Sequence, residues 1–133
     1  MTQLERAGRA SETVATVAWL GYDTPRWSDQ AGSDNLAHAG AAPLSHYLQS
    51  VDVTTTDADQ HLTLVGHSYG SLTSGLALQH RANAVVDDYV AYGSPGFYAI
   101  DECQLGMQQG HVFVMQAADD PIRVIAERPM VWR

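Results

Sequence analysis

Apolar residues gather in four short runs along the chain, and polar or turn-forming residues bound each run. The runs contain many β-branched residues, which favour extended backbone. They predict four strands, at about residues 14–20, 62–66, 85–92 and 111–117. The first run, TVATVAWL, is β-branched and apolar throughout, so we expect a strand that is buried on both faces.

Between these runs, apolar and small residues recur at helical spacing. The positions on one such face are Ala37, Gly40, Ala41, Leu44 and Leu48. Asp34 stands where it could cap this helix, and Pro43 marks either a kink or a later start. A second helix follows Ser68 and runs to about His80, whereas residues 51–60 read as a polar connection.

Strands that alternate with helices and short turns predict a parallel sheet with right-handed crossovers. We therefore expect an α/β fold, a three-layer sandwich around a mostly parallel sheet. With 133 residues, the chain is long enough for one modest core, so residues 1–133 are interpreted as a single domain.

Composition excludes several classes of partner. The net charge is −8, and the seven basic residues are all arginine, which argues against nucleic-acid binding. No apolar stretch approaches the ~20 residues of a membrane span, and the first ten residues have no apolar signal core, so we expect a cytoplasmic protein. Cys103 is alone, which excludes an intrachain disulfide and a cysteine-based zinc site. We expect no metal and no organic cofactor.

One short motif carries chemistry. In the segment GHSYG, Gly66 and Gly70 flank Ser68 at two residues on either side, between a predicted strand and a predicted helix. That context is typical of a nucleophile elbow, a sharp turn that presents a catalytic serine at the carboxyl edge of a sheet. We expect side chains at both glycines to collide with the neighbouring helix and strand. The alternative is a glycine turn in which the serine has no catalytic role.

A serine nucleophile needs an acid, a base and oxyanion donors. Asp120 follows the last predicted strand and is the favoured acid, with Asp119 as an alternative, and the backbone N–H of Tyr69 is the expected oxyanion donor. In this type of fold the histidine comes after the acid, but no histidine follows Asp120 here. His67, inside the motif, is expected to pack under the neighbouring strands.

Several segments together resemble one known family. The segments VATVAWLGYDTP, LTLVGHSYGSLTSGLAL, VVDDYVAYGSPG and VMQAADDPI, in this order, resemble the actinobacterial α/β-hydrolase family catalogued as domain of unknown function 1023. The resemblance covers about residues 14–125 and implies serine-hydrolase chemistry on an unidentified substrate. The candidate residues that line a substrate pocket are Gly21, Tyr22, Asp23, His67 and Ser94.

This chain also departs from the family pattern. Domains of that family have an earlier strand, whose following turn would supply a second oxyanion donor, and they continue past the acid to a histidine. The resemblance therefore implies an incomplete α/β-hydrolase fold that lacks an N-terminal strand and the C-terminal histidine segment. We expect hydrolysis of a small acyl compound through Ser68, with weak or no activity in the isolated chain, and self-association through an unpaired strand edge. The rival interpretation is a non-catalytic binding module that keeps the scaffold.

Overall fold

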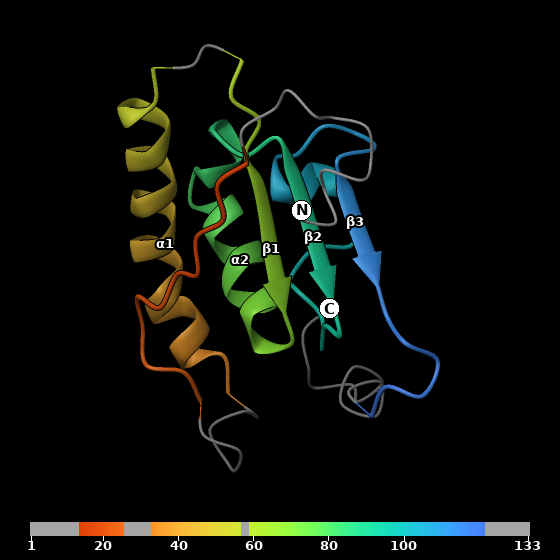
Figure 1. Cartoon of the computed structure of the whole chain (residues 1–133). Helices are drawn as coiled ribbons and strands as arrows, with labels where there is room; N and C mark the ends of the chain where they lie inside the picture. Colours follow the sequence, from red (N-terminus) through yellow and green to blue (C-terminus); the bar gives the residue numbers. More distant parts are fainter. Residues whose placement is uncertain (1–13, 26–32, 57–58, 122–133) are drawn as a thin grey trace.

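The computed structural model describes residues 14–25, 33–56 and 59–121 (Figure 1). The elements within these ranges, in chain order, are α1 (Asn35–Thr54), β1 (Thr63–His67), α2 (Tyr69–Gln79), η3 (Ala82–Ala84), β2 (Asp88–Tyr92), η4 (Glu102–Leu105) and β3 (Val112–Met115). Strands alternate with helical segments along the chain, and the predicted α/β class is confirmed.

The three strands form one parallel sheet in the order β1-β2-β3. The register pairs Val65 with Val90 and Val90 with Phe113, so these three side chains form a row across one face. Three of the four predicted strands are therefore confirmed. The second of these begins later than predicted, because the Val86 N–H bonds to the Ala82 carbonyl at 3.0 Å and closes a helical turn before β2.

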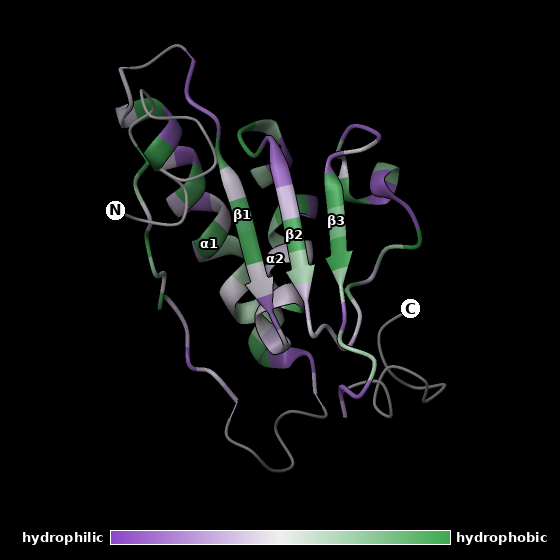
Figure 2. Ribbon diagram, turned by 45° about the vertical axis from the view of Figure 1, so that its right-hand side comes forward, coloured by the Kyte–Doolittle hydropathy of each residue, from purple (hydrophilic) through white to green (hydrophobic). Residues whose placement is uncertain are grey.

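Both long helices lie on the same face of the sheet (Figures 1 and 2). The core on that face joins Leu44 of α1 and Leu78 of α2 to Leu64 of β1 and Tyr89 of β2. The opposite face carries exposed apolar side chains, which are Val65, Tyr92, Phe113 and Met115. A helical layer over this second face, which a three-layer sandwich requires, is not among the described residues.

Helix α1 buries the predicted stripe, because Ala37, Gly40, Ala41, Leu44 and Leu48 all lie in the interior. Pro43 lies inside the helix, so the alternative of a later start is wrong. The helix continues to Thr54, four residues into the segment that was predicted to be a polar connection. Neither α1 nor any other helix in the described ranges is long and apolar enough to cross a membrane.

Asp34 is the N-cap residue of α1, but its side chain does not cap the helix. The carboxylate instead accepts a hydrogen bond from the Tyr98 hydroxyl at 2.5 Å and lies 3.3 Å from the His38 ring. The bond from Tyr98 lowers the pKa of Asp34. Burial, together with this carboxylate, raises the pKa of Tyr98 to about 12. The loop that follows β2 is thereby tied to the start of α1.

The predicted strand at 14–20 is not observed, and this prediction is wrong. The described part of this segment is irregular, and Val17 and Leu20 are 64% and 85% exposed rather than buried. In Figure 1 it runs from near the upper end of β1 obliquely down towards α1, and it makes no strand pairing with the described sheet. β-branched residues favour a strand only where a neighbouring strand supplies the ladder of hydrogen bonds. Only Trp19 of this segment packs against the main core.

Candidate active site

Ser68 lies at the tip of the turn between β1 and α2. Its backbone angles are φ 50° and ψ −126°, which side-chain-bearing residues rarely adopt. Its N–H donates to the Tyr92 carbonyl at 3.1 Å, which extends the contact between β1 and β2 by one residue. The residue is partly exposed and stands at the carboxyl edge of the sheet. The local geometry is that of a strand–turn–helix elbow.

The two glycines of the motif have different structural roles. A Cβ on Gly66 would lie 2.7 Å from the Ser71 Cα and 3.1 Å from the Gly70 carbonyl oxygen, so the close approach of α2 to β1 requires glycine there. A Cβ on Gly70 would meet nothing within 4 Å. The predicted collision is therefore correct for Gly66 and wrong for Gly70, because the second glycine has turned with the helix towards open space.

Tyr69 is the first residue of α2, so its N–H has no acceptor within the helix and lies at the positive end of the helix dipole. Its side chain is occupied elsewhere: the hydroxyl donates to the Ser33 carbonyl at 2.7 Å and accepts from the Ala37 N–H at 3.0 Å. Burial raises the pKa of this hydroxyl. The side chain thus fixes the start of α2 against the start of α1.

Asp120 lies in the turn that follows β3, where its N–H bonds to the Ala117 carbonyl at 3.2 Å. Gly93, which follows β2 and has φ 54°, lies next to the Asp120 carboxylate. A Cβ on Gly93 would lie 3.1 Å from Asp120 Oδ2 and 3.4 Å from His67 Nε2. The carboxylate and the imidazole thus both lie next to Gly93 at the carboxyl edge, the same edge as Ser68. Asp119 is exposed.

His67 does not pack under the neighbouring strands, and that prediction is wrong. The residue is exposed, and its ring stacks on the Tyr92 ring with centroids 4.5 Å apart and planes at 22°. The reason is the alternation of β1, in which Leu64 and Gly66 face the helices while Val65 and His67 face the opposite side.

The remaining pocket candidates separate into two groups. Ser94 lies directly under the elbow, where its Oγ is 2.6 Å from Ser71 Oγ. Tyr22 packs against α1 and α2, with its hydroxyl 3.2 Å from Thr73 Oγ1 and its ring where a Gly40 Cβ would be. Gly21 and Asp23 are exposed, and the Trp19 ring covers the place of a Gly21 Cβ.

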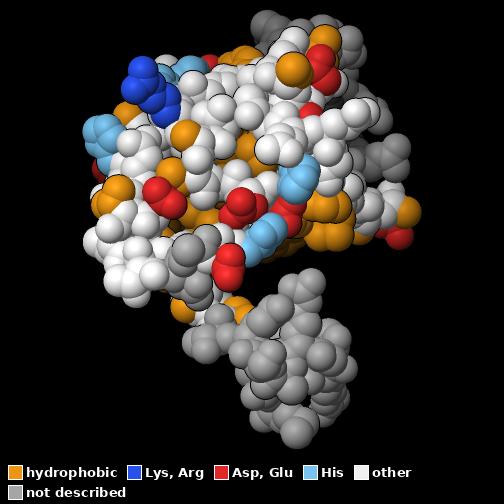
Figure 3. Space-filling model, turned by 90° about the horizontal axis from the view of Figure 1, so that it is seen from above, with side chains coloured by type: hydrophobic (Ala, Val, Ile, Leu, Met, Phe, Trp, Pro, Cys, Tyr) orange, Lys and Arg blue, Asp and Glu red, His pale blue; other side chains and the backbone are white. Residues whose placement is uncertain are grey.

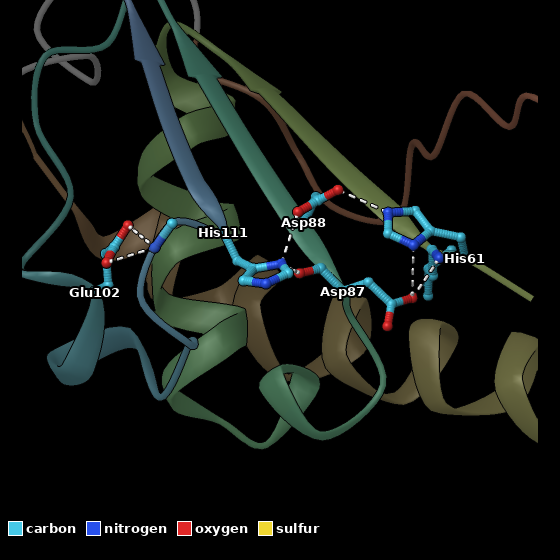
Figure 4. A network of polar contacts seen from close by, with 7 residues as sticks. His61, Asp87, Asp88, Glu102 and His111 are labelled. Atoms are coloured by element: carbon cyan, nitrogen blue, oxygen red, sulfur yellow. Dashed lines mark hydrogen bonds and ion pairs between the residues drawn. The ribbon is translucent and has the colours of Figure 1, made fainter.

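A second polar cluster was missed by the sequence analysis (Figure 4). Asp88 bridges two histidines: Oδ2 lies 2.7 Å from His61 Nε2, and Oδ1 lies 2.9 Å from His111 Nδ1. The hydrogen bond from His61 is the main cause of a lowered pKa of Asp88. One signal was available, because His61 and His111 lie next to or at the starts of predicted strands, Asp88 lies in the first half of another, and parallel strands start at one edge. The cluster therefore ties the amino ends of β1, β2 and β3 together.

Acidic and histidine side chains gather on the face seen in Figure 3. A polar hollow of about 290 Å³ also lies at the amino edge, lined by Asp52, Gln60, Asp87 and His111 among others. Within the described ranges, no three His, Cys, Asp or Glu side chains are arranged to hold a metal ion. The hollow is at the opposite edge from Ser68, so it is not part of the elbow site.

A parallel sheet, an elbow serine at its carboxyl edge and a helix that starts at the next residue are the architecture of α/β hydrolases. The chain belongs to this family, because the family model described as alpha/beta hydrolase matches residues 1–129.

The curated relatives are mycobacterial proteins. The Mycobacterium tuberculosis protein named "Uncharacterized protein Rv0963c" is 44% identical over 119 residues, which cover 89% of this chain and 44% of the relative. The Mycobacterium bovis protein named "Uncharacterized protein Mb0988c" has the same identity and coverage. A second M. tuberculosis protein, "Uncharacterized protein Rv2079", is 31% identical over 125 residues and is covered to 19% of its length. The chain thus spans less than half the length of these relatives. No solved structure matches it significantly.

Proposed function

We propose that this chain carries the nucleophile of a serine hydrolase that cleaves an ester or a related acyl compound. The observation that supports the proposal is the backbone of Ser68, held at φ 50° and ψ −126° between β1 and α2. Backbone strain of this kind costs about 1–3 kcal/mol and is concentrated at functional sites. Membership of the alpha/beta hydrolase family supports hydrolysis as the class of reaction.

In the proposed reaction, Ser68 Oγ bonds to the acyl carbon, and the electron pair of the C=O bond moves onto the oxygen. The Tyr69 N–H, at the N-terminus of α2, donates to that negative oxygen and stabilises it. The C–O bond to the leaving alcohol then breaks, and the alcohol takes up the proton that Ser68 released. Water hydrolyses the resulting acyl-serine and regenerates the hydroxyl.

A base must accept the Ser68 proton, because a serine hydroxyl is a poor nucleophile at its free pKa. In the proposal, Asp120 orients a histidine base, yet no histidine follows Asp120 in this sequence. His67 and Asp120 both lie near Gly93, but the His67 ring faces the side of the sheet opposite the helices and stacks on Tyr92. We therefore expect the 133-residue chain to turn over short p-nitrophenyl esters no faster than its Ser68→Ala variant.

A fluorophosphonate probe tests the nucleophile directly, because its phosphorus is far more electrophilic than an ester carbonyl and one attack per chain is enough to detect, so slow labelling is measurable even without the histidine base. We expect peptide mapping to find the adduct on Ser68, with no adduct in Ser68→Ala. The matched control is Ser50→Ala, which removes an exposed hydroxyl on α1 that bonds to the His46 carbonyl at 2.8 Å, and it should label like the parent. A parent chain that is not labelled at Ser68 would refute the proposal and favour the binding module. Ester turnover clearly above that of Ser68→Ala would show that a histidine in this chain, with His67 the first to mutate, serves as the base.

Three further points belong to the same proposal. Residues 1–133 act as one α/β-hydrolase domain. The substrate of this domain is a small acyl compound. Copies of the chain associate with one another through an unpaired strand edge. β1 and β3 are the outer strands of the described sheet, and an unpaired edge is a template for pairing. Light scattering at increasing protein concentration measures the association, and a strict monomer throughout would exclude it.

A further inference from the structure

We propose that Ser71 and Ser94 are positioning residues that orient the Tyr69 N–H towards the oxyanion. This inference rests on the proposed function of Ser68. It starts from a run of short hydrogen bonds beneath the elbow. Ser71 Oγ lies 2.6 Å from the Ser68 carbonyl oxygen and 2.6 Å from Ser94 Oγ, and the Gly96 N–H lies 3.0 Å from Ser94 Oγ.

The direction of the protons follows from the donor inventory. A carbonyl oxygen only accepts, so the single Ser71 hydroxyl proton goes to the Ser68 carbonyl. Ser71 Oγ is then the acceptor for the Ser94 hydroxyl, and Ser94 Oγ accepts from the Gly96 N–H. We call this ordered series, from Gly96 through Ser94 and Ser71 to the Ser68 carbonyl, the hydroxyl relay.

The relay fixes one peptide plane. The Ser68 carbonyl and the Tyr69 N–H belong to the same planar trans peptide, so they point in opposite directions. The Ser68 carbonyl accepts from both the Ser71 hydroxyl and the Ser71 N–H, at 2.6 and 3.0 Å, and is held towards α2. The Tyr69 N–H is thereby held pointing away from these donors, with no acceptor inside its own helix.

Ser71 is itself immobilised on its other side. It is buried, and its carbonyl accepts from the Tyr89 hydroxyl at 2.7 Å. Tyr89 is among the largest fully buried side chains of the core, so the relay is anchored to the sheet rather than to solvent. A series of hydrogen bonds of this kind holds an oxyanion donor in place before the substrate binds. Oxyanion donors are effective because they are preorganised in this way.

The test uses Ser71→Ala and Ser94→Ala, with Ser94→Thr retaining the hydroxyl. The matched control is Ser45→Ala, because Ser45 is also buried and also bonds a backbone carbonyl at 2.6 Å, that of His80. Two quantities are measured in each folded variant: the rate of fluorophosphonate labelling at Ser68 and the position of the Tyr69 amide signal in ¹H–¹⁵N spectra.

We expect both relay variants to slow labelling by about tenfold or more, since loss of one oxyanion donor costs about 10²–10³-fold in catalysis. Both should also shift the Tyr69 amide signal, whereas Ser94→Thr and the control stay close to the parent. If Ser71→Ala and Ser94→Ala label as fast as the control and leave the Tyr69 amide in place, the inference is wrong. Absence of labelling in the parent would overturn the proposed function alone, and the Tyr69 amide would then decide whether the relay holds this peptide.

Discussion

The two glycines that flank Ser68 should respond in opposite ways to alanine. In Gly66→Ala the new Cβ would meet backbone atoms of Ser71 and Gly70 at 2.7–3.1 Å, and backbone on both sides cannot yield as a flexible side chain would. Overpacking of this kind costs about 1–3 kcal/mol. Gly70→Ala meets nothing within 4 Å and lies in the first turn of α2, where alanine has the higher helix propensity, so we expect no loss and a gain of up to about 1 kcal/mol.

Urea unfolding followed by circular dichroism measures both variants against the parent. With a slope of about 1–3 kcal/mol per molar urea, a loss of about 2 kcal/mol moves the midpoint down by about 1 M. Gly70→Ala should keep or slightly raise the midpoint with the same slope. If Gly66→Ala unfolds at the parent's midpoint, or if both variants lose stability equally, the packing argument for the elbow is incorrect.

Three other measurements follow from the described contacts. The lowered pKa of Asp88, caused mainly by the bond from His61, means that its carboxylate stabilises the fold above the unfolded value of 3.8. The stability difference between parent and Asp88→Asn should therefore be full near pH 5 and shrink as the pH falls below 3.8 through the folded pKa; a difference that stays constant on acidification would contradict this. Tyr98→Phe should remove one phenol from the ultraviolet titration near pH 12, because burial and Asp34 raise the pKa of Tyr98 to about 12; unchanged absorbance there would exclude the pairing. Gly93→Ala places a side chain at φ 54° and should lower stability by about 1–2 kcal/mol in thermal unfolding, and an unaltered melting curve would disprove the strain.

Local patterns predicted most of the fold. The stripe from Ala37 to Leu48 is a helix face because spacing alone decides which side of a helix is buried. The turn at Ser68 was predictable because a strand, a motif with glycine and a helix follow one another within a few residues. The strand at 14–20 failed because a strand depends on its neighbour across the sheet, which lies elsewhere in the sequence and has no local signature.

The difference between local patterns and contacts between residues far apart in sequence also explains what was missed at the site. Ser94 was named as a pocket residue, but its hydroxyl turned out to support the elbow from beneath, through Ser71. That contact spans 23 positions in sequence and depends on how closely α2 approaches β2. The side on which His67 lies also depends on the register of β1 against the helices, since a shift by one residue exchanges the two faces.

The separation of the two sheet edges has a practical consequence for attaching the protein to a surface. A five-residue strand such as β1 spans about 16 Å, which is twice the screening length of about 8 Å at physiological ionic strength. Changes of charge at the amino edge should therefore leave the field at Ser68 almost unaltered. Cys103, the single cysteine of the sequence, is exposed in η4, and its neighbour Glu102 bonds to the Gly110 N–H just before β3 begins. A maleimide at this thiol would fix the molecule by its amino edge and leave the serine edge facing the solution.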